Sequence, residues 1–82
     1  MSIIQNSVDR SGIKLTSQDA HVKEVGRAFL YIMRNDLHDK PFGFMEDVYV
    51  AEEMRGKGLG TSLVKRVIAL AKEMGCYKLI AT

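Results

Sequence analysis

Three glycines at alternate positions mark the stretch of this chain whose residue types point most directly to chemistry. They lie in the heptapeptide Arg55-Gly56-Lys57-Gly58-Leu59-Gly60-Thr61, between a β-rich run ending at Val50 and an apolar-periodic run beginning at Leu59. A loop of this kind at the start of a helix leaves backbone N–H groups unpaired, and glycines let an anion approach them closely. The helix dipole, with Arg55 and Lys57, therefore favours a phosphate or pyrophosphate, although such glycines are as typical of a plain turn.

The spacing of the loop excludes two familiar phosphate-binding motifs. A P-loop has Gly-Lys followed directly by Ser or Thr, whereas Gly58 follows Lys57 here. A dinucleotide-binding fingerprint has its last glycine three positions after the second, whereas Gly60 comes two positions after Gly58. The loop therefore predicts neither P-loop nucleotide hydrolysis nor hydride transfer from a dinucleotide.

Two neighbouring acids, Glu46 and Asp47, precede the loop in a predicted strand, Phe42–Val50. The two-residue period of a strand sends Phe42, Phe44, Glu46, Val48 and Val50 to one face and Gly43, Met45, Asp47 and Tyr49 to the other. Glu46 then stands in an apolar row, where burial makes a charge costly and demands a partner or a function. The alternative is that Glu46 lies near a strand end or a bulge and is solvated.

A helix over residues 59–74 is the clearest element that follows the loop. Its apolar positions recur at steps of three and four residues: Leu59, Leu63, Val64, Val67, Ile68, Ala71 and Met74. Gly75 is suited to end the helix in left-handed backbone, and residues 76–82 read as a final strand. A strand, a crossover helix and a second strand imply that Phe42–Val50 and residues 76–82 run parallel.

The segments before the loop predict further strands. Ile3 and Ile4 suggest a frayed or edge segment, residues 13–16 alternate as a short strand, and residues 17–20 carry turn-forming types. Residues 22–34 contain an apolar run that fits a strand covered on both faces, with a helix as the alternative. Residues 35–41 form a polar turn with a proline, which predicts a hairpin into Phe42–Val50.

Length and composition indicate one ordinary globular domain over residues 1–82. Hydrophobic residues make up 46% and charged residues 27% of the 82 positions, which disfavours disorder. A net charge of +2 is too weak to indicate a nucleic acid or a membrane as partner. The chain has one cysteine, no leader-like start and no long apolar run, so we expect a cytoplasmic protein without an intrachain disulfide.

The segment from Arg55 to Gly60 resembles the acyl-CoA pyrophosphate loop of the GNAT superfamily of N-acetyltransferases. The signature of that loop is Gln or Arg, two residues, Gly, one residue, and Gly or Ala, and every position matches. The flanks fit as well, because residues 46–54 resemble the strand and acidic turn before the loop and residues 63–82 the helix and strand after it. The resemblance implies an α/β (α+β) fold, with an antiparallel N-terminal meander and a parallel β-α-β unit in one mixed sheet.

The resemblance also implies a site for acetyl-CoA and a reaction. Its pyrophosphate would be held by Arg55, Gly56, Lys57, Gly58, Gly60 and Thr61. Its pantetheine arm would pair with the main chain of Val48, Tyr49 and Val50, because the family splays its two central parallel strands here. Glu46, with Asp47 as second choice, would take the proton of a small-molecule or peptide amine that attacks the thioester directly, without a covalent enzyme intermediate.

Other side chains are assigned no chemistry. Cys76 follows a helix C-terminus among apolar neighbours, which favours a structural thiol over a thiolate. His21 and His38 lie in predicted turns without ligand spacing to Cys76, so no metal is expected.

The family pattern is incomplete in this chain, which matches a short or truncated acetyltransferase core. The two helices usual between the first two strands and the elements usual after the fifth strand are missing from the sequence. Three interpretations follow: an enzyme core completed by a partner, a homodimer being the simplest case; a non-catalytic acyl-CoA-binding module; or an interaction fragment that pairs by strand addition.

Overall fold

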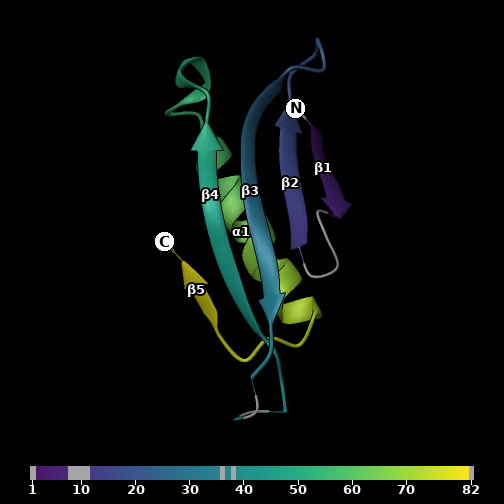
Figure 1. The fold of residues 1–82 in the computed structure, drawn as a ribbon. Coiled ribbons are helices and arrows are strands. Elements are labelled where there is room, and N and C mark those ends of the chain that lie inside the picture. Colours follow the sequence, from purple (N-terminus) through teal and green to yellow (C-terminus); the bar gives the residue numbers. More distant parts are fainter. Residues whose placement is uncertain (1, 8–11, 36, 38, 82) are drawn as a thin grey trace.

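The computed structural model describes residues 2–7, 12–35, 37 and 39–81, which form a five-stranded sheet with one long helix packed against it (Figure 1). The strands are β1 (Ser2–Ser7), β2 (Gly12–Gln18), β3 (Glu24–Met33), β4 (Phe42–Val50) and β5 (Leu79–Ala81), in this order across the sheet. β1 to β4 form an antiparallel meander, and β5 runs parallel to β4. A short 3-10 helix, η1 (Glu52–Met54), and the helix α1 (Leu59–Glu73) connect β4 to β5. The predicted mixed sheet with a β-α-β unit is confirmed.

The strand bounds differ from the expected ones at several ends. β4 has the predicted bounds, and β3 is a strand and not the alternative helix. β1 is a six-residue edge strand, and β2 continues through Ser17 and Gln18, which pair with β3 where a turn was expected. The final strand is shorter than predicted, because only Leu79–Ala81 pair with β4. Thr82 lies outside the described residues.

The core lies between α1 and one face of the sheet. The sheet contributes Leu15, Val25, Ala28, Leu30 and Met45, and α1 contributes Leu59, Leu63, Val67, Leu70 and Ala71. Most of the predicted helix face is confirmed, but Ile68 and Met74 are 39% and 43% exposed, whereas Leu70, which the pattern omitted, is 7% exposed. Ile68 lines a hollow between α1 and residues 76–79, and Met74 lies just past the last turn of α1. No helix in the described part of the chain is long and apolar enough to span a membrane.

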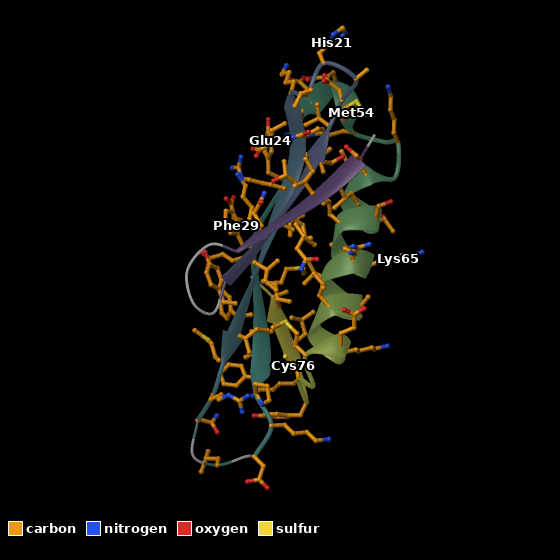
Figure 2. The ribbon with its side chains drawn as sticks, turned by 90° about the vertical axis from the view of Figure 1, so that its right-hand side faces the viewer. His21, Glu24, Phe29, Met54, Lys65 and Cys76 are labelled. Carbon is orange, nitrogen blue, oxygen red and sulfur yellow. The ribbon has the colours of Figure 1, made fainter. Side chains whose placement is uncertain are left out.

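The opposite face of the sheet carries aromatic and charged side chains instead of a helix. Figure 2 shows Glu24 and Phe29 on this side of the sheet, away from α1, and Lys65 on the outer side of α1. The Phe29 and Tyr31 rings stack with centroids 6.1 Å apart. This face is therefore available for polar interactions that link neighbouring strands.

Candidate functional site

The loop between η1 and α1 turns twice through left-handed backbone. Gly56 and Gly58 have φ angles of 79° and 82°, which residues with a Cβ adopt only with strain. Gly58 is the N-cap residue of α1, and no side chain caps the helix there. Its carbonyl oxygen accepts hydrogen bonds from the Ser62 N–H (3.0 Å) and the Ser62 hydroxyl (3.1 Å). The N–H groups of the first helical turn consequently lack a side-chain acceptor and are suited to an anion.

A cavity of about 290 Å³ opens against this helix N-terminus. It is lined by Val50, Met54, Arg55, Gly56, Gly58, Leu59, Gly60 and Thr61. A Cβ on Gly56 or Gly58 would meet no atom within 4 Å, so open space lies beside both glycines. A Cβ on Gly60 would lie 3.4 Å from Val50 Cγ2. The loop therefore forms a concave site in which the backbone at Gly56 and Gly58 is open to a ligand, and this shape fits a phosphate group.

Two cations flank the cavity in different ways. Arg55 lines it, and its Nε donates a hydrogen bond to the Val50 carbonyl oxygen at 3.1 Å, which ties the loop to the end of β4. Lys57, between the two left-handed glycines, is exposed and does not line the cavity. Five of the six residues predicted for the pyrophosphate thus lie around one cavity, with Lys57 beside it.

The second half of β4 has an open edge on the side away from β3. β5 pairs with Gly43, Phe44 and Met45, and Figure 1 shows β4 continuing past the end of β5. Within the described residues, no strand pairs with β4 on this side from Val48 to Val50. Open backbone groups at a strand edge are suited to an added extended ligand. This edge leads directly to the glycine cavity, which Val50 also lines.

A β-bulge interrupts β4 before this open edge. The register pairs Phe29 with Glu46 and Arg27 with Tyr49. Between these pairs, Asp47 and Val48 together oppose the single residue Ala28. Asp47 has a φ of 55°, the left-handed conformation that glycine usually supplies in one class of bulge.

The bulge makes the predicted alternation wrong beyond Glu46. Because residues paired across antiparallel strands share a face, Tyr49 lies on the same face as Glu46 and not on the opposite one. Val50, expected on the Glu46 face, instead approaches Gly60 of α1. Glu46 is exposed, so the expected apolar row is wrong and the alternative, solvation beside a bulge, is confirmed.

The two candidate acids have different surroundings. Asp47 accepts hydrogen bonds from Arg27 Nε at 3.0 Å and from Arg27 Nη2 at 3.5 Å. Glu46 has no hydrogen-bond or ion-pair partner in the part of the chain that the structure describes. Of the two carboxylates, Glu46 is thus the one open to a substrate.

Sequence reasoning did not include Arg27 in this site. Arg27 and Asp47 are 20 residues apart and meet only through the register of β3 and β4. The one available signal is Asp47 itself, because aspartate tolerates left-handed backbone better than most residues.

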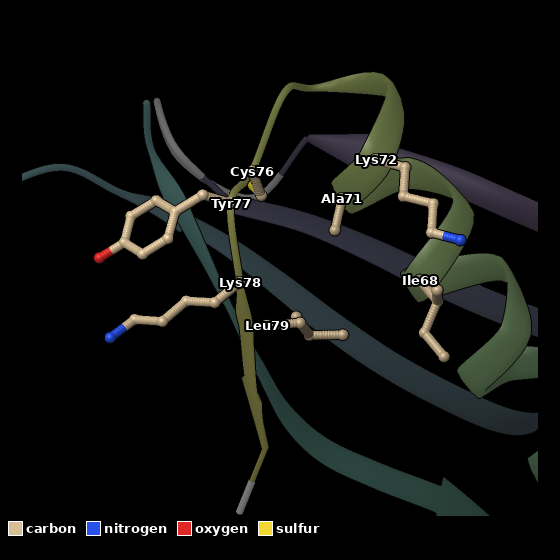
Figure 3. Close-up of a pocket in the computed structure, with 7 residues that line it drawn as sticks. All are labelled: Ile68, Ala71, Lys72, Cys76, Tyr77, Lys78 and Leu79. Carbon is tan, nitrogen blue, oxygen red and sulfur yellow. The ribbon is translucent and has the colours of Figure 1, made fainter. Parts of the chain in front are cut away.

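A second hollow, of about 380 Å³, lies between α1 and β5 (Figure 3). Figure 3 shows Leu79 directed toward α1, with Tyr77 and Lys78 on the other side of the strand, where Lys78 Nζ lies 5.5 Å from the centre of the Tyr77 ring. Cys76 borders the hollow, and burial raises the pKa of its thiol, which disfavours a nucleophilic thiolate. The hollow therefore offers no activated thiol.

Metal-ligating residue types do not gather in the described residues, where no group of three or more His, Cys, Asp and Glu could hold a metal ion. His21 lies in the turn after β2, where its N–H donates a hydrogen bond to Asp19 Oδ1 at 2.8 Å. His38 lies outside the described residues.

Comparison with known proteins points to acetyltransferases. The profile of the acetyltransferase (GNAT) family matches residues 19–82. A probable glucosamine 6-phosphate N-acetyltransferase of Drosophila melanogaster is 45% identical over 56 residues, covering 67% of this chain and 26% of that protein. A probable glucosamine 6-phosphate N-acetyltransferase 2 of Oryza sativa subsp. japonica is 53% identical over 38 residues, covering 46% of this chain and 23% of that protein. Each match thus spans about a quarter of the length of the relative.

Solved structures share the fold. Glucosamine-6-phosphate N-acetyltransferase from Arabidopsis thaliana superposes with a TM-score of 0.82 at 28% identity, over 88% of this chain and 50% of that one. An acetyltransferase from Trypanosoma brucei superposes with a TM-score of 0.83 at 28% identity, over 88% of this chain and 52% of that one. This chain therefore corresponds to about half of either structure.

Proposed function

The chain belongs to the acetyltransferase (GNAT) family, as its loop indicated, and we propose that it binds acetyl-CoA and transfers the acetyl group directly to an amine. The observation that carries the proposal is the continuity of two features: a glycine cavity at the start of α1, and the strand β4, whose last residue, Val50, lines that cavity. Together they match a ligand with an anionic end and an extended, amide-containing arm.

The anionic end of acetyl-CoA is proposed to bind in the glycine loop. Four backbone amides would donate hydrogen bonds to it, those of Gly56, Gly58, Gly60 and Thr61. Arg55 and Lys57 would add positive charge, and the partial positive charge of the α1 N-terminus acts in the same direction. Gly56 and Gly58 support this assignment because a Cβ at either position would stand in the open space beside the amides.

The pantetheine arm is proposed to lie along the open edge of β4. The main-chain groups of Val48, Tyr49 and Val50 would pair with its amides as though it were another strand. Val50, the last residue of β4, lines the glycine cavity, and this supports the proposal because an arm that follows β4 would lead to the pyrophosphate site.

Glu46 is proposed as the general base. Acetyl-CoA supplies the activated acetyl thioester. The amine nitrogen attacks the carbonyl carbon, the carbon–sulfur bond breaks, and Glu46 accepts the proton that the amine releases, directly or through water. The exposure of Glu46 supports this role, whereas Asp47, the second choice, is engaged by Arg27.

The acceptor is proposed to be a primary amine, and an amino sugar phosphate is the first one to test. The relatives from fly and rice and the structure from Arabidopsis are named for glucosamine 6-phosphate. A homodimer is the simplest assembly in which a second copy covers the outer edge of β5, and this assembly is also a proposal.

Thermal unfolding with and without CoA tests the binding step. At a hundredfold excess over its dissociation constant, CoA stabilises a protein by about 2.7 kcal/mol, which raises Tm by roughly 10 to 20 °C for a domain of this size. A shift with acetyl-CoA turnover on an amine supports the transferase, and a shift without turnover supports a non-catalytic acyl-CoA-binding module. Absence of any shift at millimolar CoA refutes the loop assignment and favours a strand-pairing fragment.

Glu46→Gln tests the proposed base. We expect kcat to fall by about a hundredfold or more while CoA affinity is retained. Glu73→Gln, at the exposed end of α1, is the matched control and should leave both quantities unchanged. A Glu46→Gln variant with the kcat of the parent chain would remove Glu46 from the mechanism.

A further inference from the structure

Asp47 adopts a left-handed backbone conformation, which aspartate tolerates better than most residues but which only glycine adopts freely. Its φ of 55° is left-handed, in a bulge position that glycine usually occupies. An aspartate persists in such a conformation when its surroundings over-determine it. The contacts of Asp47 should therefore show what holds the bulge in place.

Those contacts come from a single arginine on the neighbouring strand. The Arg27 guanidinium reaches both carboxylate oxygens of Asp47, at 3.0 and 3.5 Å. The same group lies 4.6 Å from the centre of the Tyr49 ring, two residues after Asp47. Arg27 Nη1 also lies 3.4 Å from Glu24, which in turn lies 2.9 Å from Lys14 Nζ on β2. One cation thus contacts both the bulged residue and the residue two positions after it, and is itself oriented by a carboxylate on β3.

The position of these groups argues against a role in global stability. The Arg27 and Asp47 side chains are 29% and 51% exposed, and ion pairs this accessible to water contribute little to folding. The bulge, however, decides which side chains each face of β4 presents. Strict alternation would put Tyr49 on the α1 face, whereas the bulge puts it beside Arg27 and turns Val50 toward the loop.

We propose that Arg27 is a positioning residue that holds the β4 bulge at Asp47 and so fixes the direction of Glu46 and the register of the open edge from Val48 to Val50. The part of this inference that concerns acetyl-CoA rests on the proposed function. Arg27 does not line the cavity, and it acts on the open edge through its contacts with the side chains of Asp47 and Tyr49.

Three variants test the role of Arg27. Arg27→Gln removes the ion pair, and Asp47→Gly in the Arg27→Gln chain supplies the residue that adopts a positive φ without a partner. Arg34→Gln is the matched control, because Arg34 lies past the end of β3 and contacts the Asp39 carbonyl oxygen. Each chain is measured by hydrogen exchange of the β3 and β4 amides without ligand, by calorimetric CoA affinity and by thermal unfolding.

We expect Arg27→Gln to speed amide exchange on both sides of the bulge and to weaken CoA binding, each by about tenfold. Its Tm should stay within roughly 2 °C of the parent value, because the ion pair is exposed. The second substitution, Asp47→Gly, should return exchange and affinity most of the way to the parent values. Arg34→Gln should resemble the parent chain throughout.

Two results would overturn the proposal. In one, Arg27→Gln exchanges and binds like the parent; in the other, its losses persist after Asp47→Gly, which would mean that Arg27 acts other than through the bulge. If Arg27→Gln does not fold, Arg27→Lys replaces it, because lysine keeps the positive charge but lacks the planar guanidinium group. Amide hydrogen exchange like that of the parent in Arg27→Lys would equally count against the proposal. A parent chain that binds no CoA refutes the proposed function, while the exchange comparison still decides the role of Arg27.

Discussion

The loop glycines meet two requirements: a positive φ at Gly56 and Gly58, and space beside the backbone amides for an anion. Replacing Gly60 with alanine helps to separate these two requirements. Gly60 lies in the first turn of α1 without the positive φ of Gly56 and Gly58, so its backbone accepts any residue. The new Cβ would lie 3.4 Å from Val50 Cγ2, which is ordinary van der Waals contact. Alanine at a compatible helical position stabilises by about 0.5 to 1 kcal/mol, and Tm should rise by roughly 2 to 8 °C for a domain of this size.

Binding of CoA should separate Gly60 from Gly58. The acyl-CoA loop signature accepts alanine at the Gly60 position, so Gly60→Ala should leave the dissociation constant for CoA near the parent value. Gly58→Ala places a Cβ in the open space beside the first-turn amides, at a φ of 82°. We expect Gly58→Ala to raise the dissociation constant about tenfold, which corresponds to about 1.4 kcal/mol.

Thermal unfolding and calorimetric titration with CoA check this prediction, with Gly75→Ala as the matched control. Gly75 has a φ of 77° at the far end of α1, so alanine there should lower stability by about 1 to 2 kcal/mol and leave CoA affinity unchanged. A folded Gly58→Ala variant that binds CoA as tightly as the parent would refute the placement of the anion at the start of α1.

Two further substitutions test the electrostatics and the core. A hydrogen bond from Lys14, with a further contribution from Arg27, lowers the pKa of Glu24 below its ordinary value of 4.5. The ionised Glu24 carboxylate therefore stabilises the fold fully above pH 4.5, and this stabilisation is lost as the pH falls through the lower pKa of the folded state. The Tm of Glu24→Gln should depend less on pH below 4.5 than the Tm of the parent, and identical pH profiles would contradict this prediction. Leu70→Ala should lower the free energy of unfolding by about 2 to 5 kcal/mol, whereas Ile68→Ala, at a position 39% exposed, should lower it much less. Denaturant unfolding compares the two variants, and equal losses of stability would contradict the observed packing of α1.

Much of the fold was predictable because it depends on neighbours in the sequence. The bounds of β4 and the start of α1 at Leu59 follow from hydrophobic period and from the glycines between them. Gly75 ends α1 with a φ of 77°, as the preference of glycine for left-handed backbone predicts. The glycine loop was predictable for the same reason, since its shape arises from two residues that lack a Cβ.

The rest depends on contacts between distant parts of the chain. The face of α1 that is buried, with Leu70 inside and Ile68 outside, depends on how the helix lies against the residues of β2, β3 and β4 that form the other half of the core.

The sequence by itself thus determined the glycine loop, the helix it begins and the strand that leads to it, because backbone preference and hydrophobic period are local properties. Only the tertiary structure decided the bulge at Asp47, and with it the exposure of Glu46, the face of Tyr49 and the contact with Arg27. The physical reason is the pairing of β3 with β4: one extra residue in one strand reverses the faces of every residue after it, and an aspartate that tolerates left-handed backbone is too common to show by itself where that residue lies.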